Sequence, residues 1–212
     1  MSLNLQDCRF VGPALPEPFV AFELEAQLRK KKLLVDRRSG DLADRWDSYR
    51  RKLRQLGDQG QEMRVATHVF EPLVERLGYA TMEREREVIT REGAENGGWV
   101  LRSPDSETVL RVWAWPAGTD LDAPNLRGRA YRFSPALVAQ RVLWARGERL
   151  GLLSDGDELR LVFATPGGGD SHVAIPLGRA GGWRSQRDVP DSYRLLLALA
   201  RPEGVLAVPD LL

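Results

Sequence analysis

Residues 134–164 read SPALVAQRVLWARGERLGLLSDGDELRLVFA, and this stretch decides the fold. Ser134 followed by Pro135 is a strong helix start, with the serine as N-cap and the proline at the first helical position, and the helix should end near Gly147. Two apolar runs then flank the turn Asp155-Gly156, a pattern that predicts a tight β-hairpin. A helix followed directly by a hairpin indicates an α/β fold.

The segments on either side of this stretch add further elements. Before it, we expect a helix over Glu62–Leu77, a strand over Thr81–Thr90 and a hairpin over Gly98–Trp115. After it, we expect an edge strand over His172–Leu177 and an apolar helix from Asp191 to Arg201. The order around residue 134 is therefore helix, strand, hairpin, helix and hairpin.

The first 60 residues differ in character and are expected to form a helical extension, with residues 61–212 as the main domain. Apolar side chains recur every three or four residues and predict one seam along a helix: Leu42, Trp46, Tyr49, Leu53 and Leu56. This seam is too short for a coiled coil that stands alone. It should pack against another helix or the main domain.

The composition sets limits on function. The 212-residue chain has 31 basic and 30 acidic residues, so a net charge of +1 supplies no overall field toward nucleic acid or a membrane. Only four residues are lysines, and the last of them is Lys52. One cysteine and two histidines make a structural zinc site an unfavourable hypothesis. Without a bilayer-spanning run or a signal peptide, we expect a cytoplasmic protein.

Several phrases carry a family resemblance: Phe70–Tyr79, the hairpin Gly98–Trp115, Asp120–Pro124, the helix that holds Ala139-Gln140-Arg141, and Leu152–Leu161. Together they resemble the N-terminal nuclease-like domains of type I restriction-enzyme R subunits and of large type IIG-like restriction-modification proteins. The resemblance covers about residues 62–164. It implies the PD-(D/E)XK restriction-endonuclease fold, a central mixed sheet flanked by helices, in a bacterial restriction or phage-defence (antiviral) system. It also implies a DNA methyltransferase or a helicase in the same chain or complex.

In that family Mg²⁺ for phosphodiester hydrolysis is held by an aspartate on one central strand and by an acidic residue on the next strand. That acidic residue stands two positions before a lysine. The first position falls here at Gly97-Gly98-Trp99. The second falls at Arg111 with Trp113, or at Trp113 with Trp115, because alternate residues of a strand share a face. The resemblance therefore implies a nuclease-like domain without catalytic residues or a bound cofactor, whose expected role is to contact DNA or to organise the restriction complex.

The sequence leaves the role of this altered cleft open. Arg111, Trp113 and Trp115 could stack on bases and hold a phosphate, or the two tryptophans could fill the core. A basic rim would contact duplex DNA without reading its sequence through Arg127, Arg129, Arg132 and Arg141.

Two alternatives stay open. The first is a Mg²⁺-dependent endonuclease whose ligands have moved to Glu85, Asp105, Glu107, Asp120 and Asp122. The second is a protein-interaction module without a nucleic-acid role, in which the apolar seam of residues 42–53 binds a partner helix.

Overall fold

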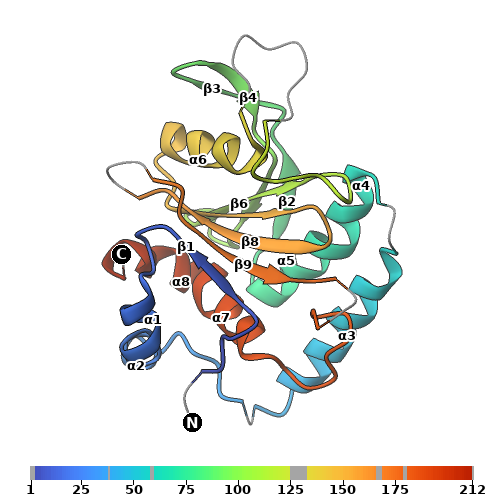
Figure 1. Cartoon of the computed structure of the whole chain (residues 1–212), viewed down its shortest axis with the longest axis vertical. Helices are drawn as coiled ribbons and strands as arrows, with labels where there is room; N and C mark the ends of the chain where they lie inside the picture. Colours follow the sequence, from blue (N-terminus) through green and yellow to red (C-terminus); the bar gives the residue numbers. More distant parts are fainter. Residues whose placement is uncertain are drawn as a thin grey trace.

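The structure is a computed structural model that describes residues 3–37, 39–57, 60–124, 133–165, 169–178 and 181–211. Its centre is a seven-stranded sheet in the order β1-β9-β8-β7-β6-β5-β2 (Figure 1). The bounds are β1 Arg9–Val11, β2 Thr81–Arg84, β5 Trp99–Arg102, β6 Val109–Ala114, β7 Leu150–Ser154, β8 Glu158–Phe163 and β9 His172–Pro176. Strands β6 and β7 run parallel, and the other neighbouring pairs are antiparallel. The fold is therefore a mixed α/β arrangement with a mostly antiparallel sheet.

Helices cover both faces of the sheet (Figure 1). Their bounds are α1 Glu17–Phe22, α2 Leu24–Lys30, α3 Leu42–Gln55, α4 Glu62–Val65, α5 Glu71–Leu77, α6 Pro135–Arg146, α7 Asp191–Ala200 and α8 Pro202–Ala207, with a 3-10 turn η2 at Val208–Asp210. Alternation along β6 sends Leu110 and Val112 into the core shared with α3, α5 and α7, and Trp113 into the core under α6. Arg111 shares the α6 side with Trp113.

Helix α6 forms as its sequence predicts. The Ser134 hydroxyl accepts a hydrogen bond from the Leu137 N–H at 3.3 Å, and Pro135 occupies the first turn. Gly147 ends the helix in the left-handed conformation, with φ of +68°. Because α6 connects β6 to the parallel strand β7, it crosses one face of the sheet. The hairpin β7–β8 follows, as the Asp155-Gly156 turn predicts.

The helix expected over Glu62–Leu77 is present but interrupted by a π-helical turn, η1 at Ala66–Phe70, between α4 and α5. Pro72 explains the change, because it has no N–H for the helical ladder and its ring would clash with the carbonyl of residue 68. A wider turn removes that clash. Gly78, with φ of +83°, then ends α5.

The prediction of a single strand over Thr81–Thr90 is wrong. The chain bends at Glu85 and Arg86, so that β2 stays in the main sheet and β3 (Glu87–Thr90) pairs with β4 (Gly93–Asn96) as a separate hairpin. The hairpin packs its buried Val88 into the core under α6. This tertiary contact overrides the local alternation, and the carboxylates of residues 83, 85 and 87 do not share one strand face.

The N-terminal residues join the main sheet. Residues 9–11, expected within a helical segment, form β1 and pair with β9, so β9 is not the edge strand that the sequence predicts. The apolar seam of α3 is confirmed, but it is buried in the same core as the sheet. The seam therefore has no free surface for a partner helix. In the part of the chain that the structure describes, no helix combines the length and apolar character needed to cross a bilayer.

Candidate functional site

The position expected for the first metal-holding aspartate lies at the start of β5 and is sterically closed. Gly98 has φ of +71°, and a Cβ added there would lie 2.8 Å from Cδ1 of Trp113. A Cβ at Gly97 would lie 2.6 Å from the Glu85 carbonyl oxygen. Side-chain atoms do not approach other heavy atoms this closely, so an aspartate at either position would require the backbone to move.

Arg111 lies on the neighbouring strand β6, with only 2% of its surface exposed. Its Nε and Nη2 donate to the two carboxylate oxygens of Glu148, each at 2.9 Å. Its Nη1 donates to Glu85 Oε2 at 2.6 Å and to the Gly97 carbonyl at 2.7 Å. A buried guanidinium with two carboxylates and a carbonyl satisfies its charge and four of its donors.

Arg146 at the end of α6 pairs with the other oxygen of Glu85. We call Arg111, Arg146, Glu85 and Glu148 the Arg111 cluster. Burial raises the pKa of Glu85, but hydrogen bonds and charge from Arg111 and Arg146 outweigh it and leave that pKa below its ordinary value. Burial lowers the pKa of Arg111, but the two glutamates outweigh it and raise that pKa. Glu85 and Arg111 are therefore both ionised near neutral pH.

Trp113 fills the rest of the expected cleft. Its indole Nε1 donates to the Asn96 carbonyl at 2.9 Å. Its ring lies against Gly98 on one side, and a Cβ at Gly151 of β7 would come within 2.8 Å of its Cζ3. Trp115 is half-buried and packs against the same core. The structure favours the core-packing interpretation of Trp113, which is buried and has no free ring face on which a base could stack, whereas Trp115 stays partly exposed.

Arg141, expected on a DNA-contacting rim, faces inward instead. It is 8% exposed, pairs with Glu92 at 2.6 Å and Glu95 at 3.5 Å, and donates to the Thr90 hydroxyl at 3.2 Å. Its guanidinium carbon also lies 3.9 Å from the centre of the Phe133 ring. These contacts hold the β3–β4 hairpin on α6 and leave Arg141 little capacity for a phosphate. The other rim residues lie outside the described residues: Arg127, Arg129 and Arg132.

Two of the displaced carboxylates precede β6. Asp105 is exposed in the turn before the strand, where it accepts hydrogen bonds from the Ser103 hydroxyl and, at 3.1 Å, from the Glu107 N–H. Glu107 is also exposed. Asp105 thus caps its own turn, as acidic residues commonly do.

Two further displaced carboxylates follow β6, and the fifth, Glu85, belongs to the Arg111 cluster. Asp120 accepts hydrogen bonds from the backbone of its own loop at 2.9 and 3.2 Å. Asp122 forms a two-pronged pair with Arg160 at 2.5 and 2.8 Å. Since a six-residue strand spans roughly 20 Å, these residues cannot share a metal ion with the pair before β6. Among the described residues, no group of three acidic, histidine or cysteine side chains has a geometry that could hold a metal.

The sequence interpretation missed the partners of Arg111. Glu148 and Arg146 flank the end of α6, and Glu85 lies at the bend after β2. One signal was present: a charged residue that alternates with buried apolar residues on a central strand requires a buried counter-charge. The sequence does not say which of the 30 acidic residues supplies it.

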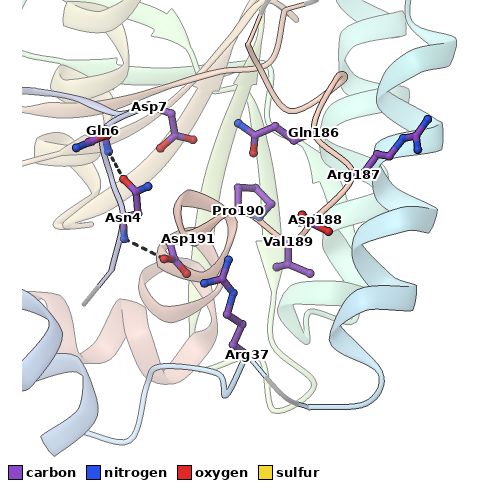
Figure 2. Close-up of a pocket in the computed structure, with 10 residues that line it drawn as sticks. All are labelled: Asn4, Gln6, Asp7, Arg37, Gln186, Arg187, Asp188, Val189, Pro190 and Asp191. Atoms are coloured by element: carbon purple, nitrogen blue, oxygen red, sulfur yellow. Dashed lines mark hydrogen bonds between the residues drawn. The ribbon is translucent and has the colours of Figure 1, made fainter. Parts of the chain in front are cut away.

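A concavity with a volume of about 590 Å³, separate from the Arg111 cluster, lies beside the first turn of α7 (Figure 2). The side chains that line it are mainly polar, and several of them form hydrogen bonds or ion pairs within the protein. The Asn4 N–H donates to Asp191 at 2.9 Å, and the Ser192 hydroxyl donates to Asp7 at 2.7 Å. Asp191 also pairs with Arg194 at 2.7 Å. These contacts fasten the N-terminal segment to α7, which gives this concavity a structural role.

Comparisons with known proteins find no matching family model, curated protein or solved structure.

Proposed function

We propose that the chain is a non-catalytic, nuclease-like domain of a bacterial restriction-modification or phage-defence system that contacts duplex DNA. The observation that carries the proposal is the Arg111 cluster. It lies where phosphodiester hydrolysis would require metal-holding oxygens beside an ammonium group. A methyltransferase or helicase component of the same system is the expected partner.

The order of the elements supports the nuclease-like assignment. Helix α5, strand β2, the pair β5 and β6, helix α6 and the hairpin β7–β8 follow one another as the resemblance implies, with the β3–β4 hairpin inserted between β2 and β5. Strands β5 and β6 are neighbours, and Val100 pairs with Arg111. The two positions that would carry catalytic residues therefore adjoin in space.

The chemistry of the cluster supports the absence of catalysis. An arginine is permanently protonated and cannot accept a proton from water. Glu85 and Glu148 are already bound to arginine, so metal binding would have to break three ion pairs. Trp113 and the two glycines fill the remaining space. In this interpretation the buried cluster replaces a metal site with a structural ion-pair network.

The proposed DNA contact is made by Arg127, Arg129 and Arg132. The described residues that flank this segment are well anchored: Asp122 binds Arg160, and Phe133 lies over Arg141. Three arginines that each neutralise one phosphate contribute a salt slope of about 2.7, or roughly 40-fold in affinity between 50 and 200 mM salt.

The test is fluorescence anisotropy with a labelled 20-base-pair duplex at 50 and 200 mM NaCl. Replacing residues 127, 129 and 132 together by alanine should weaken binding at low salt and remove most of the salt dependence. A matched control replaces three exposed arginines elsewhere: Arg37, Arg51 and Arg187. The proposal fails if the wild type shows no binding at 50 mM salt, or if the control variant loses as much affinity as the test variant.

A further inference from the structure

Another polar pocket, of about 660 Å³, lies among α3, α5, α7 and the turn between β5 and β6. It is distinct from the Arg111 cluster and from the concavity beside the first turn of α7. Four of its lining residues are basic: Lys32, Arg45, Arg76 and Arg201. Three are acidic: Glu75, Asp105 and Glu203. The hydrogen-bond partners of the basic residues decide what the pocket can accept.

The basic residues are poorly matched by carboxylates. Arg45 pairs with Asp41 at 2.7 Å. Among the described residues, Arg76 donates only to neutral acceptors, which include the Pro72 carbonyl at 2.5 Å and the Ser48 hydroxyl at 3.0 Å. Within the described parts of the chain, the side chains of Lys32 and Arg201 form no hydrogen bond or ion pair.

Arg201 is the unusual member of this set. Exposed arginines without a partner are solvated and need no explanation, but Arg201 is half-buried between α7 and α8. Burial, and then the charge of Arg45, lower the pKa of Arg201 despite weaker opposing effects from Glu203 and Tyr193. A partly buried positive charge beside another one is unfavourable unless an anion compensates it.

Tyr193 provides an independent observation. Its side chain is 0% exposed, and its hydroxyl has no hydrogen-bond partner among the described residues. Burial raises the pKa of Tyr193 to about 12, and the charges of Arg76, Arg201 and Arg45, which line the pocket, oppose this effect. The phenol ring itself is fixed by aromatic packing, with the Trp46 ring centre 5.0 Å away. Tyr193 is therefore a buried donor without an acceptor among the described residues, one turn before the pocket-lining Leu197 and Ala198 on α7.

We propose that this pocket binds a small molecule through a phosphate group, held by Arg76 and Arg201, with Lys32 and Arg45 at the rim. A phosphate supplies several acceptor oxygens and up to two negative charges, which match guanidinium donors better than a single carboxylate does. The carboxylates of Glu75 and Glu203 limit the approach of larger polyanions. Asp105 is held by its own turn, through the Glu107 N–H at 3.1 Å. The pocket volume leaves space for a group attached to the phosphate.

The test is isothermal titration calorimetry without DNA, at constant ionic strength in a chloride buffer, with inorganic phosphate and a nucleoside monophosphate as the two probes. Saturable binding of either probe is expected, and tighter binding of the nucleotide would identify a phosphoester rather than free phosphate as the ligand. Arg201→Gln should weaken binding by about tenfold or more, as expected for a lost charged hydrogen bond. Arg187→Gln, an exposed arginine outside this pocket, should change binding less than twofold.

A second readout separates binding from folding. Because Arg201 lacks a counter-charge, Arg201→Gln should melt at or above the wild-type temperature without phosphate, and phosphate should raise only the wild-type melting temperature. Lys32→Gln, at an exposed position, should weaken binding by about two- to fivefold without unfolding the protein. The proposal is overturned if neither probe binds below about 10 mM, or if Arg201→Gln and Lys32→Gln bind as the wild type does. Neither result depends on whether the chain binds DNA.

Discussion

Replacing Arg111 by methionine should destabilise the protein strongly, because it leaves two carboxylates without their counter-charge. Methionine keeps the length of the side chain and part of its packing but removes all the donors. Glu148 loses both hydrogen bonds from Arg111, and Glu85 retains only Arg146. The stranded charges, rather than the missing methylene contacts, account for most of the expected loss.

The size of the loss follows from the exposure of the two glutamates. Removing one member of a buried ion pair costs about 3–5 kcal/mol. The side chains of Glu85 and Glu148 are 27% and 12% exposed, so water recovers part of the interaction and the lower end of that range applies. We expect a decrease of about 3 kcal/mol in the free energy of unfolding. For a chain of this length that corresponds to roughly 6–12 °C in melting temperature.

Urea unfolding at pH 7, followed by tryptophan fluorescence, measures this change. The variant with Arg111→Met, Glu85→Gln and Glu148→Gln together should be more stable than Arg111→Met alone, since no charge is left unpaired. Arg146→Met, at a side chain that is 44% exposed, should cost less than about 1 kcal/mol. A loss below about 0.5 kcal/mol for Arg111→Met, or a triple variant less stable than the single one, would refute the reasoning.

Three further predictions concern other parts of the molecule. Gly98→Ala should cost about 2–4 kcal/mol in urea unfolding, because it combines a left-handed backbone with a steric clash. Gly57→Ala is its matched control: both glycines have φ of +71°, and nothing lies within 4 Å of the Cβ at Gly57, so only the backbone cost of about 1 kcal/mol should appear. The lowered pKa of Glu85 contributes stability that is fully present above its unfolded value of about 4.3 and is lost as the pH falls through the folded value. Glu85→Gln should therefore flatten the decrease in stability measured by urea titration between about pH 5 and pH 3, and an unchanged slope would contradict the assignment. Burial, and then the charge of Asp7, raise the pKa of the Cys8 thiol well above its usual range, so a thiol reagent at about pH 8 should react slowly with the folded protein and rapidly after unfolding.

The sequence predicted correctly those elements whose ends are determined by capping or turn residues close to them in the chain. Ser134, Pro135 and Gly147 determine both ends of α6, and the Asp155-Gly156 turn determines the hairpin after it. Interactions between distant segments were not predictable in this way. Residues 9–11 become a strand because β9 offers an edge for pairing, and the chain leaves β2 at Glu85 because Arg111 binds that side chain.

The candidate site shows the same division. The two-residue period of a strand correctly placed Arg111 and Trp113 on one face of β6. It did not show whether that face was open or closed, because the groups that close it are Glu85 and Glu148, 26 and 37 residues away in the sequence. The inward orientation of Arg141 was missed for a similar reason. Its partners Glu92 and Glu95 lie in the turn and second strand of the β3–β4 hairpin, and the sequence interpretation had merged the first strand of that hairpin into a strand over Thr81–Thr90.

The central claim is that an ion-pair network closes the face that β5 and β6 present toward α6, and that the domain does not hydrolyse DNA. The most direct test is to incubate the purified protein with supercoiled plasmid DNA in the presence of Mg²⁺ or Mn²⁺, and to follow conversion to nicked or linear forms by gel electrophoresis. The account predicts that the plasmid stays supercoiled over hours at protein concentrations that retard it. Metal-dependent cleavage by the wild type that is lost in Glu85→Gln would contradict the account.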